Sequence, residues 1–117
     1  MKVLVVDDEM PARARLCALL QDLGGYQVCG EAANGREALQ LSEAEHPDVL
    51  LLDIRMPGMD GLEAARHLQL REQPPAIIFT TAYNDYALQA FETHAVDYLL
   101  KPVRKERLED ALRHAQR

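Results

Sequence analysis

Polar residues that could do chemistry follow four strongly apolar segments of this 117-residue chain. The segments are residues 3–6, 49–52, 77–79 and 98–100, and the polar residues are Asp7, Asp8, Asp53, Thr81 and Lys101. Such short apolar runs are typical of strands buried on both faces of a parallel sheet, where ligands bind outside the carboxyl ends of the strands. We therefore expect three carboxylates, a hydroxyl and an ammonium group in one crevice.

This set of groups predicts a cation site used in phosphoryl transfer. Crowded carboxylates repel one another and stay ionised only beside a counter-charge, which a divalent cation with oxygen ligands supplies. Mg²⁺ next to a carboxylate and a lysine is typical of phosphoryl transfer. A single aspartate after a strand is more often a helix cap or turn residue, and Lys101 alone could be a surface lysine. Four strand ends with complementary groups favour the functional interpretation.

Composition and charge describe one globular domain. Hydrophobic residues make up 48% and charged residues 27%, and no apolar stretch approaches the roughly 18 residues of a membrane span. The start leads directly into a strand rather than a signal peptide, so we expect a cytoplasmic protein without membrane contact. A net charge of -6 and a pI of about 5.1 argue against direct nucleic-acid binding. Cys17 and Cys29 are expected to be buried free thiols.

Strand and helix patterns alternate along the chain. Strands are predicted at residues 2–6, 26–32, 48–52, 76–80 and 97–100, and the mixed composition of residues 26–32 suits an edge strand. Capping boxes begin helices at Asn34 and Asp60, and a further helix is predicted at residues 85–93. The pattern predicts an α/β, flavodoxin-like (CheY-like) fold, a doubly wound five-stranded parallel sheet of order 2-1-3-4-5 with helices on both faces.

Four motifs resemble the receiver domain of two-component response regulators over the whole length, residues 1–117. They are Val6-Asp7-Asp8-Glu9, the segment 52–61 around Asp53, Thr80-Thr81-Ala82 and Lys101-Pro102. Segments 82–91 and 95–102 are similar to the LytR/AlgR subgroup, whose effector is a LytTR DNA-binding domain. The resemblance implies that such an effector lies beyond Arg117.

The resemblance also implies a role for each site residue. Asp53 would accept a phosphoryl group from a sensor histidine kinase, by self-catalysed phosphotransfer followed by autodephosphorylation rather than as an enzyme. Lys101 would pair with the phosphoryl group, Thr81 would donate to it, and Tyr98 would then move inward. A cis peptide is implied between Lys101 and Pro102. The implied Mg²⁺ ligands are Asp7, Asp8, Asp53 and the main-chain carbonyl of Arg55.

The same residues argue against two other functions. A haloacid-dehalogenase-like phosphatase needs a second aspartate two residues after the nucleophile, and that position is Arg55. A flavodoxin needs a hydroxyl-rich phosphate loop, whereas Asp7 and Asp8 would repel the flavin phosphate. A phosphorylation-independent pseudo-receiver that acts as an interaction module stays open as the alternative.

Two further expectations concern lifetime and assembly. The resemblance implies that phosphoryl lifetime is tuned by the residues two positions after the phosphoacceptor and after the switch threonine, here Arg55 and Tyr83. Both are bulky and neither is a carboxylate or amide that could position a water, which favours a long-lived phosphoryl group. The face formed by helix 85–93, strand 97–100 and the last helix is expected to form a homodimer on phosphorylation, with Tyr83, Tyr86 and Phe91 around it. The alternative is that these aromatic residues pack inward. For Tyr98 the alternative is packing on the last helix, which is compatible with its role in the switch.

Overall fold

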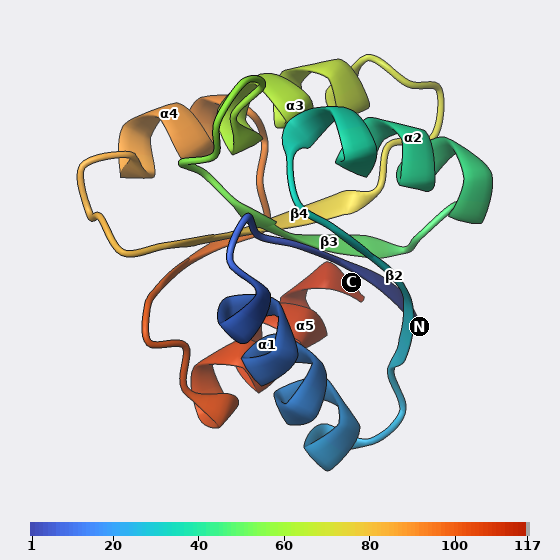
Figure 1. The fold of residues 1–117 in the computed structure, drawn as a ribbon, viewed down its shortest axis with the longest axis vertical. Helices are drawn as coiled ribbons and strands as arrows, with labels where there is room; N and C mark the ends of the chain where they lie inside the picture. Colours follow the sequence, from blue (N-terminus) through green and yellow to red (C-terminus); the bar gives the residue numbers. More distant parts are fainter. Residues whose placement is uncertain (117) are drawn as a thin grey trace.

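The computed structural model describes residues 1–116, which form a central sheet covered by helices (Figure 1). The strands are β1 (Lys2–Val6), β2 (Gln27–Ala32), β3 (Val49–Asp53), β4 (Ala76–Thr81) and β5 (Asp97–Leu100). The helices are α1 (Met10–Leu23), α2 (Gly35–Glu45), α3 (Gly61–Gln69), α4 (Ala87–Glu92) and α5 (Lys105–Ala115). Among residues 1–116, no helix combines the length and apolar character that crossing a membrane requires.

The sheet separates two apolar cores. Figure 1 shows α2, α3 and α4 on one face and α1 and α5 on the other. Because successive side chains of a strand point to opposite faces, each central strand contributes to both cores. On β3, Leu50 and Leu52 pack toward α2 and α3, while Val49 and Leu51 pack toward α1 and α5. Burial on both faces explains why β1, β3 and β4 are almost continuously apolar.

The strand order is β2-β1-β3-β4-β5 and all four pairings are parallel, as the sequence predicts. The register places Val6 opposite Leu52, Asp53 opposite Thr80, and Thr81 opposite Leu100. The carboxyl ends of β1, β3, β4 and β5 therefore meet at one edge of the sheet. β2 lies at the outer edge, which confirms its expected position.

Side-chain caps begin the two helices where the sequence predicts them. Asn34 Oδ1 accepts from the Glu37 amide at 2.9 Å, and Asp60 Oδ1 accepts from the Glu63 amide at 2.9 Å. The start of α3 is also tightly packed. A Cβ at Gly61 would lie 2.0 Å from the main-chain oxygen of Asp53, so only glycine allows α3 to begin this close to the end of β3.

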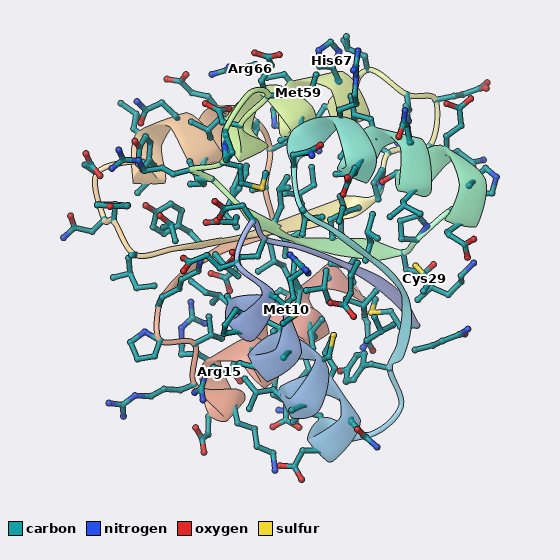
Figure 2. The ribbon with its side chains drawn as sticks, viewed as in Figure 1. Met10, Arg15, Cys29, Met59, Arg66 and His67 are labelled. Atoms are coloured by element: carbon teal, nitrogen blue, oxygen red, sulfur yellow. The ribbon has the colours of Figure 1, made fainter. Side chains whose placement is uncertain are left out.

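The outer surfaces of the two helical layers lie on opposite sides of the molecule. Figure 2 shows Arg66 and His67 projecting from α3 away from the sheet, whereas Arg15 extends from α1 on the other side. Cys29 lies on β2, and both it and Cys17 are free thiols. Both side chains are half-buried, so the prediction of free thiols is confirmed and the prediction that they are buried holds only in part. β2 at the sheet edge is covered only in part, which leaves Cys29 accessible.

The fourth helix is shorter than predicted. It comprises Ala87–Glu92 rather than residues 85–93, and Tyr86 occupies its N-cap. The Tyr86 amide donates to the Tyr98 hydroxyl at 3.3 Å, and the first helical hydrogen bond runs from the Ala90 amide to the Tyr86 oxygen at 2.9 Å. A contact with β5 therefore determines where α4 begins.

Candidate functional site

Three carboxylates meet at the carboxyl edge of the sheet. Asp7 and Asp8 follow β1 directly, and Asp53 is the last residue of the neighbouring strand β3. One carboxylate oxygen from each residue lies within 4.8 Å of those of the other two. Asp7 is fully buried and Asp53 is 5% exposed, while Asp8 is open to solvent. We call Asp7, Asp8 and Asp53 the acidic cluster.

Asp7 is held by contacts to both its side chain and its main chain. Its Oδ1 accepts from the Glu9 amide at 2.9 Å, and its Oδ2 accepts from Lys101 Nζ at 2.6 Å. Its own amide donates to the Ala32 carbonyl on β2 at 3.0 Å. A buried carboxylate requires such partners to remain ionised, and together they fix its orientation.

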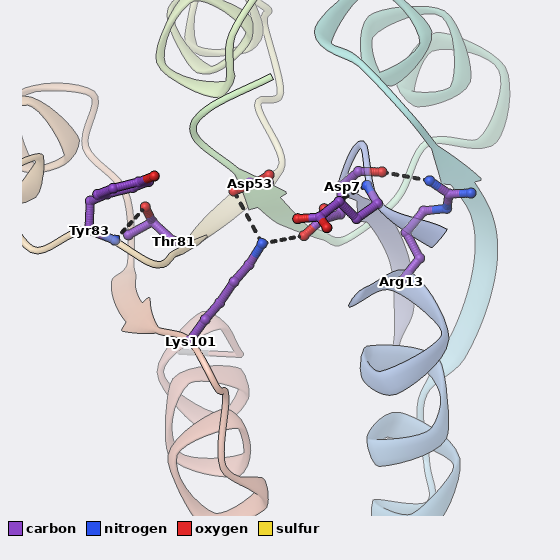
Figure 3. Close-up of polar contacts among 7 residues, drawn as sticks. Asp7, Arg13, Asp53, Thr81, Tyr83 and Lys101 are labelled. Carbon is purple, nitrogen blue, oxygen red and sulfur yellow. Dashed lines mark hydrogen bonds and ion pairs between the residues drawn. The ribbon is translucent and has the colours of Figure 1, made fainter. Parts of the chain in front are cut away.

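Lys101 provides the positive charge of the site. It follows β5, and its amide donates to the Thr81 carbonyl at 2.7 Å, which continues the pairing of β4 with β5. Its ammonium lies 2.6 Å from Asp7 Oδ2 and 3.5 Å from Asp53 Oδ1 (Figure 3). Burial alone would lower the pKa of Lys101, but the hydrogen bond to Asp7 and the charge of Asp53 raise it. The peptide bond between Lys101 and Pro102 is cis.

The acidic cluster has too little positive charge. Burial, followed by the charge of Asp7, raises the pKa of the Asp53 carboxyl from an ordinary 3.8 to about 7, and Lys101 offsets only part of this rise. One ammonium therefore stands against three carboxylates. Hard oxygen donors converging on one point are the ligands that Mg²⁺ prefers, and the charge of a divalent cation would favour the ionised form of Asp53. The donor set thus fits Mg²⁺.

The loop from β4 to α4 links Thr81 to Tyr98. The buried Thr81 hydroxyl accepts from the Tyr83 amide at 3.1 Å. The Tyr98 hydroxyl donates to the Tyr83 carbonyl and accepts from the Tyr86 amide. Tyr98 packs against the core on the α2, α3 and α4 face, so the alternative in which it packs on the last helix is wrong. The hydrogen bonds to Tyr83 and Tyr86 hold the Tyr98 hydroxyl against the loop that follows Thr81.

Arg55 and Tyr83 form a cation–π pair at the carboxyl edge of the sheet. The Arg55 guanidinium carbon lies 4.3 Å from the centroid of the Tyr83 ring. Arg55 follows Asp53 by two residues, and Tyr83 follows Thr81 by two residues, so each comes from a loop at the carboxyl edge of the sheet. Tyr83 also meets Tyr86 edge to face, with 6.5 Å between ring centroids. The sequence identified Arg55 and Tyr83 as bulky, but not their stacking.

A hollow in the surface lies at the other edge of the sheet from these groups. It measures about 660 Å³ and is lined by residues that include Ser42, Asp48, Arg71 and Pro75. Asp48 and Pro75 precede β3 and β4, so this hollow lies at the amino ends of the strands. Ligands of open parallel sheets bind at the carboxyl ends, and the acidic cluster is there.

The comparison with known proteins decides the family. A model of the response regulator receiver domain matches residues 3–113. The chain belongs to this family. Receiver domains of response regulators are phosphorylation-controlled signalling switches of two-component systems rather than enzymes acting on a separate substrate.

Named relatives agree with this assignment. The positive alginate biosynthesis regulatory protein of Pseudomonas aeruginosa is 55% identical over the whole receiver domain, which covers 48% of that protein. The transcriptional regulatory protein LytR of Staphylococcus aureus is 42% identical over 96% of the receiver domain and 46% of its own length. These relatives confirm the LytR/AlgR subgroup. The receiver domain spans about half the length of each.

Solved structures confirm the predicted fold class. The response regulatory domain of protein mrkE from Klebsiella pneumoniae superposes with a TM-score of 0.91 at 32% identity, over 99% of this chain and 95% of that one. The response regulator domain of CheB from Thermotoga maritima gives a TM-score of 0.88 at 27% identity, over 100% and 97% of the two chains.

The receiver domain brings Asp7, Asp8, Asp53 and Lys101 into one cluster, with Thr81 buried at the neighbouring strand end. Sequence reasoning missed Arg13, whose Nη1 donates to the Asp7 carbonyl at 2.7 Å. Its signal was its place in the first turn of the helix that directly follows the acidic loop. Side chains of a helix lean toward its amino end, so an arginine there can reach back over the loop.

Proposed function

We propose that this receiver domain accepts a phosphoryl group on Asp53 from a sensor histidine kinase, with Mg²⁺ bound at the acidic cluster, and thereby controls transcription in the cytoplasm. The observation that carries the proposal is the convergence of three carboxylates and the Lys101 ammonium at one edge of the sheet. Two relatives that share this domain are named regulatory proteins of alginate biosynthesis and of transcription.

In the proposed reaction Asp53 is the nucleophile. A carboxylate oxygen of Asp53 forms a bond to phosphorus while the bond from phosphorus to the histidine nitrogen of the donor breaks, and that nitrogen keeps the electron pair. An ionised carboxylate needs no general base, and positioning provides most of the catalysis because the transition state is loose. Glycine at position 61 keeps the main chain at Asp53 in close contact with α3, which helps to fix the nucleophile.

The cation would be held by this chain's own oxygen atoms. Asp8 and Asp53 would be direct ligands, with the main-chain carbonyl of Arg55, and Asp7 would bind directly or through water. Bound Mg²⁺ supplies charge that stabilises the transferring phosphoryl group. Lys101, whose ammonium lies 3.5 Å from Asp53 Oδ1, would pair with a phosphoryl oxygen as a second positive charge.

The output would pass through Thr81 and Tyr98. A phosphoryl group on Asp53 would accept a hydrogen bond from the Thr81 hydroxyl, which now accepts from the Tyr83 amide. Inward movement of Tyr98 would then break its hydrogen bonds to Tyr83 and Tyr86. The loop between β4 and α4 would rearrange, and with it the face formed by α4, β5 and α5. The added charge biases a two-state element rather than deforming a rigid one.

The partners follow from the family and from the lengths of the relatives. We infer that a DNA-binding output domain, of LytTR type, follows this receiver domain in the full-length protein. We also infer that phosphorylation brings two receiver domains together through the face formed by α4, β5 and α5. Leu88 and Phe91 on α4 are 70% and 79% exposed, which leaves apolar surface for a second copy.

The experiment is intact mass spectrometry after incubation with acetyl phosphate and Mg²⁺. We expect wild type to gain one phosphoryl group and Asp53→Asn to gain none. Asp110→Asn, at an exposed aspartate of α5, is the matched control and should be labelled like wild type. Labelling of Asp53→Asn to the normal extent would place the acceptor elsewhere, and no labelling of wild type would favour the pseudo-receiver.

A Mg²⁺ titration tests the cation ligands. Asp8→Ala removes a carboxylate from the acidic cluster and should weaken binding by about tenfold or more, because Mg²⁺ gives up its water only for good ligands. Glu9→Ala removes the neighbouring exposed carboxylate, which lies outside the cluster, and should bind almost as wild type. Equal affinities for Asp8→Ala and wild type would move the cation to another place.

A further inference from the structure

Arg13 connects three parts of the fold beside the acidic cluster. It lies in the first turn of α1, and its side chain is 17% exposed. Nη1 donates to the main-chain oxygen of Asp7 at 2.7 Å, and Nε donates to Glu31 Oε1 on β2 at 3.2 Å (Figure 3 shows the contact with Asp7). One planar group thus joins the end of β1, the edge strand and α1.

The contact with Asp7 leaves the carboxylate oxygens free of the guanidinium. Asp7 Oδ1 is taken by the Glu9 amide and Oδ2 by Lys101, whereas Arg13 binds the main-chain oxygen. The arginine therefore fixes the backbone from which Asp7 and Asp8 project, and does not compete for the oxygens that would hold a cation. A guanidinium suits this role because its donors have a fixed planar geometry.

Glu31 determines the direction of the Arg13 side chain. Its carboxylate accepts from Nε while Nη1 reaches the Asp7 oxygen, so the plane of the guanidinium is defined by two acceptors. The carboxylate also balances the arginine charge near a site that needs a cation. This balance matters because an uncompensated positive charge would oppose the binding of Mg²⁺.

We propose that Arg13 is a positioning residue for the cation site, oriented by Glu31, and that it holds the loop after β1 in the conformation that binds Mg²⁺. The proposal rests on the proposed function of the acidic cluster. It differs from a general stabilising role, because the arginine binds the one loop that contributes two of the three carboxylates. Groups that orient metal ligands typically change affinity by 10–100-fold when they are removed.

Arg71 offers a matched comparison within the same chain. Its Nη2 donates to the Leu39 carbonyl at 3.1 Å, so it is also an arginine that binds a main-chain oxygen on another element. Leu39 lies in α2, and Arg71 lies just beyond α3, away from the acidic cluster. Arg71→Met therefore removes the same kind of contact without touching the loop after β1.

The test compares Mg²⁺ affinity by calorimetric titration for wild type, Arg13→Met, Arg13→Lys, Glu31→Gln and Arg71→Met. Arg13→Met should weaken binding by roughly tenfold. Arg13→Lys should recover part of the loss, because an ammonium can still donate to the Asp7 carbonyl. Glu31→Gln keeps an acceptor for Nε and should lose only a few-fold. Arg71→Met should bind as wild type.

Amide hydrogen exchange without Mg²⁺ gives a second measurement. The Glu9 amide donates to Asp7 Oδ1, so it reports the conformation of the loop. Arg13→Met should speed its exchange by several-fold relative to amides of β3, and Arg71→Met should not. The thermal midpoint of each variant shows whether it is folded.

Three results would overturn the proposal. They are Mg²⁺ affinity of Arg13→Met equal to or tighter than that of wild type, an equal loss in Arg71→Met, or unchanged exchange of the Glu9 amide. These results are distinguishable from failure of the proposed function. If wild type binds Mg²⁺ but acetyl phosphate does not label Asp53, the phosphoacceptor role fails while the titration still decides the role of Arg13.

Discussion

Asp53 lies where its own ionisation is opposed. It is almost fully buried, Asp7 is beside it, and Lys101 is shared between the two carboxylates at 2.6 and 3.5 Å. The pKa of about 7 expresses this conflict in the absence of a cation. A nucleophile that becomes fully ionised only when a cation is bound would couple phosphorylation to Mg²⁺.

The raised pKa predicts how stability depends on pH without added divalent cation. Between pH 4 and pH 7 the raised pKa means that the folded chain holds a proton on Asp53 that the unfolded chain has released, so the contribution of Asp53 to stability falls as the pH rises from about 4 to about 7. Asp53→Asn cannot titrate. It should therefore be more stable than wild type at pH 8, by on the order of 2 kcal/mol after allowing for solvent screening, and the difference should shrink toward pH 4.

Urea denaturation at pH 4, 6 and 8 measures this difference. Asp110→Asn, at an exposed position, should stay close to wild type at all three pH values. A stability difference between Asp53→Asn and wild type that stays constant across the range would show that Asp53 has an ordinary pKa. Added Mg²⁺ should reduce the difference at pH 8, because bound cation stabilises the ionised carboxylate.

The stacked pair of Arg55 and Tyr83 predicts a long phosphoryl lifetime. Both side chains come from loops at the carboxyl edge of the sheet, where Asp53 lies. The Arg55 guanidinium carbon is 4.3 Å from the centroid of the Tyr83 ring, and we expect this stacked pair to hinder an attacking water. Replacing both by asparagine should speed the loss of the phosphoryl group by roughly two- to fivefold. This factor corresponds to lowering the activation free energy by the energy of one exposed cation–π contact. Arg66→Asn, on the outer surface of α3, is the control. Decay that is unchanged or slower in the double variant would contradict the prediction.

At the scale of elements, hydrogen bonds from Tyr98 on β5 hold the loop between β4 and α4. The Tyr98 hydroxyl makes contacts to Tyr83 and Tyr86, and these contacts also determine the start of α4. α4 itself is short, with only Ala90 fully buried, so it has little packing of its own. A short helix with few buried side chains, held to β5 through the hydrogen bonds of Tyr98, is the part of the fold that can move.

Tyr98→Phe removes both hydrogen bonds and keeps the ring. We expect the free energy of unfolding to fall by about 1 kcal/mol, and the Tyr86 amide to exchange faster with solvent. Tyr26→Phe is the control, because among residues 1–116 its hydroxyl accepts only an exposed hydrogen bond, from Gln116 at 3.3 Å. Equal exchange of the Tyr86 amide in Tyr98→Phe and wild type would show that the hydrogen bonds of the Tyr98 hydroxyl do not hold the loop.

At the scale of the whole molecule, large apolar side chains are exposed on α4 and β5. Leu88, Phe91 and Leu100, on α4 and β5, are 70%, 79% and 50% exposed. Beside them Asp97 forms an ion pair with Arg107 of α5 at 3.0 Å. The alternative of inward-packed aromatic residues is wrong for Phe91. A two-fold dimer would place this patch against its own copy, with charges at the rim.

We expect beryllofluoride, a phosphoryl mimic, to shift the receiver domain from monomer to dimer in analytical ultracentrifugation. Phe91→Ser should weaken the dimer about tenfold or more, because a central aromatic residue contributes much of the binding energy of an interface. Leu70→Ser removes an apolar residue that is 85% exposed beyond α3, outside this face, and should dimerise normally. A protein that stays monomeric at high concentration with beryllofluoride would rule out the dimer.

Local patterns in the amino-acid sequence are enough to predict the parallel sheet, its strand order and the meeting of the strand ends. Apolar runs that end in Asp7, Asp53 and Lys101 are local patterns, and parallel order then brings their ends to one edge. These predictions depend only on short-range periodicity and on the few topologies open to alternating strands and helices. The placement of the acidic cluster follows from them.

Contacts between side chains of different elements could not be predicted from the sequence and are known from the three-dimensional structure. The contact of Tyr98 with the loop after Thr81, the reach of Arg13 to Asp7 and the stacking of Arg55 on Tyr83 each join loops or elements that lie apart in the sequence. Lys101 and Asp7 are separated by 94 positions. Such contacts depend on exact packing distances and rotamers, which local sequence patterns do not specify.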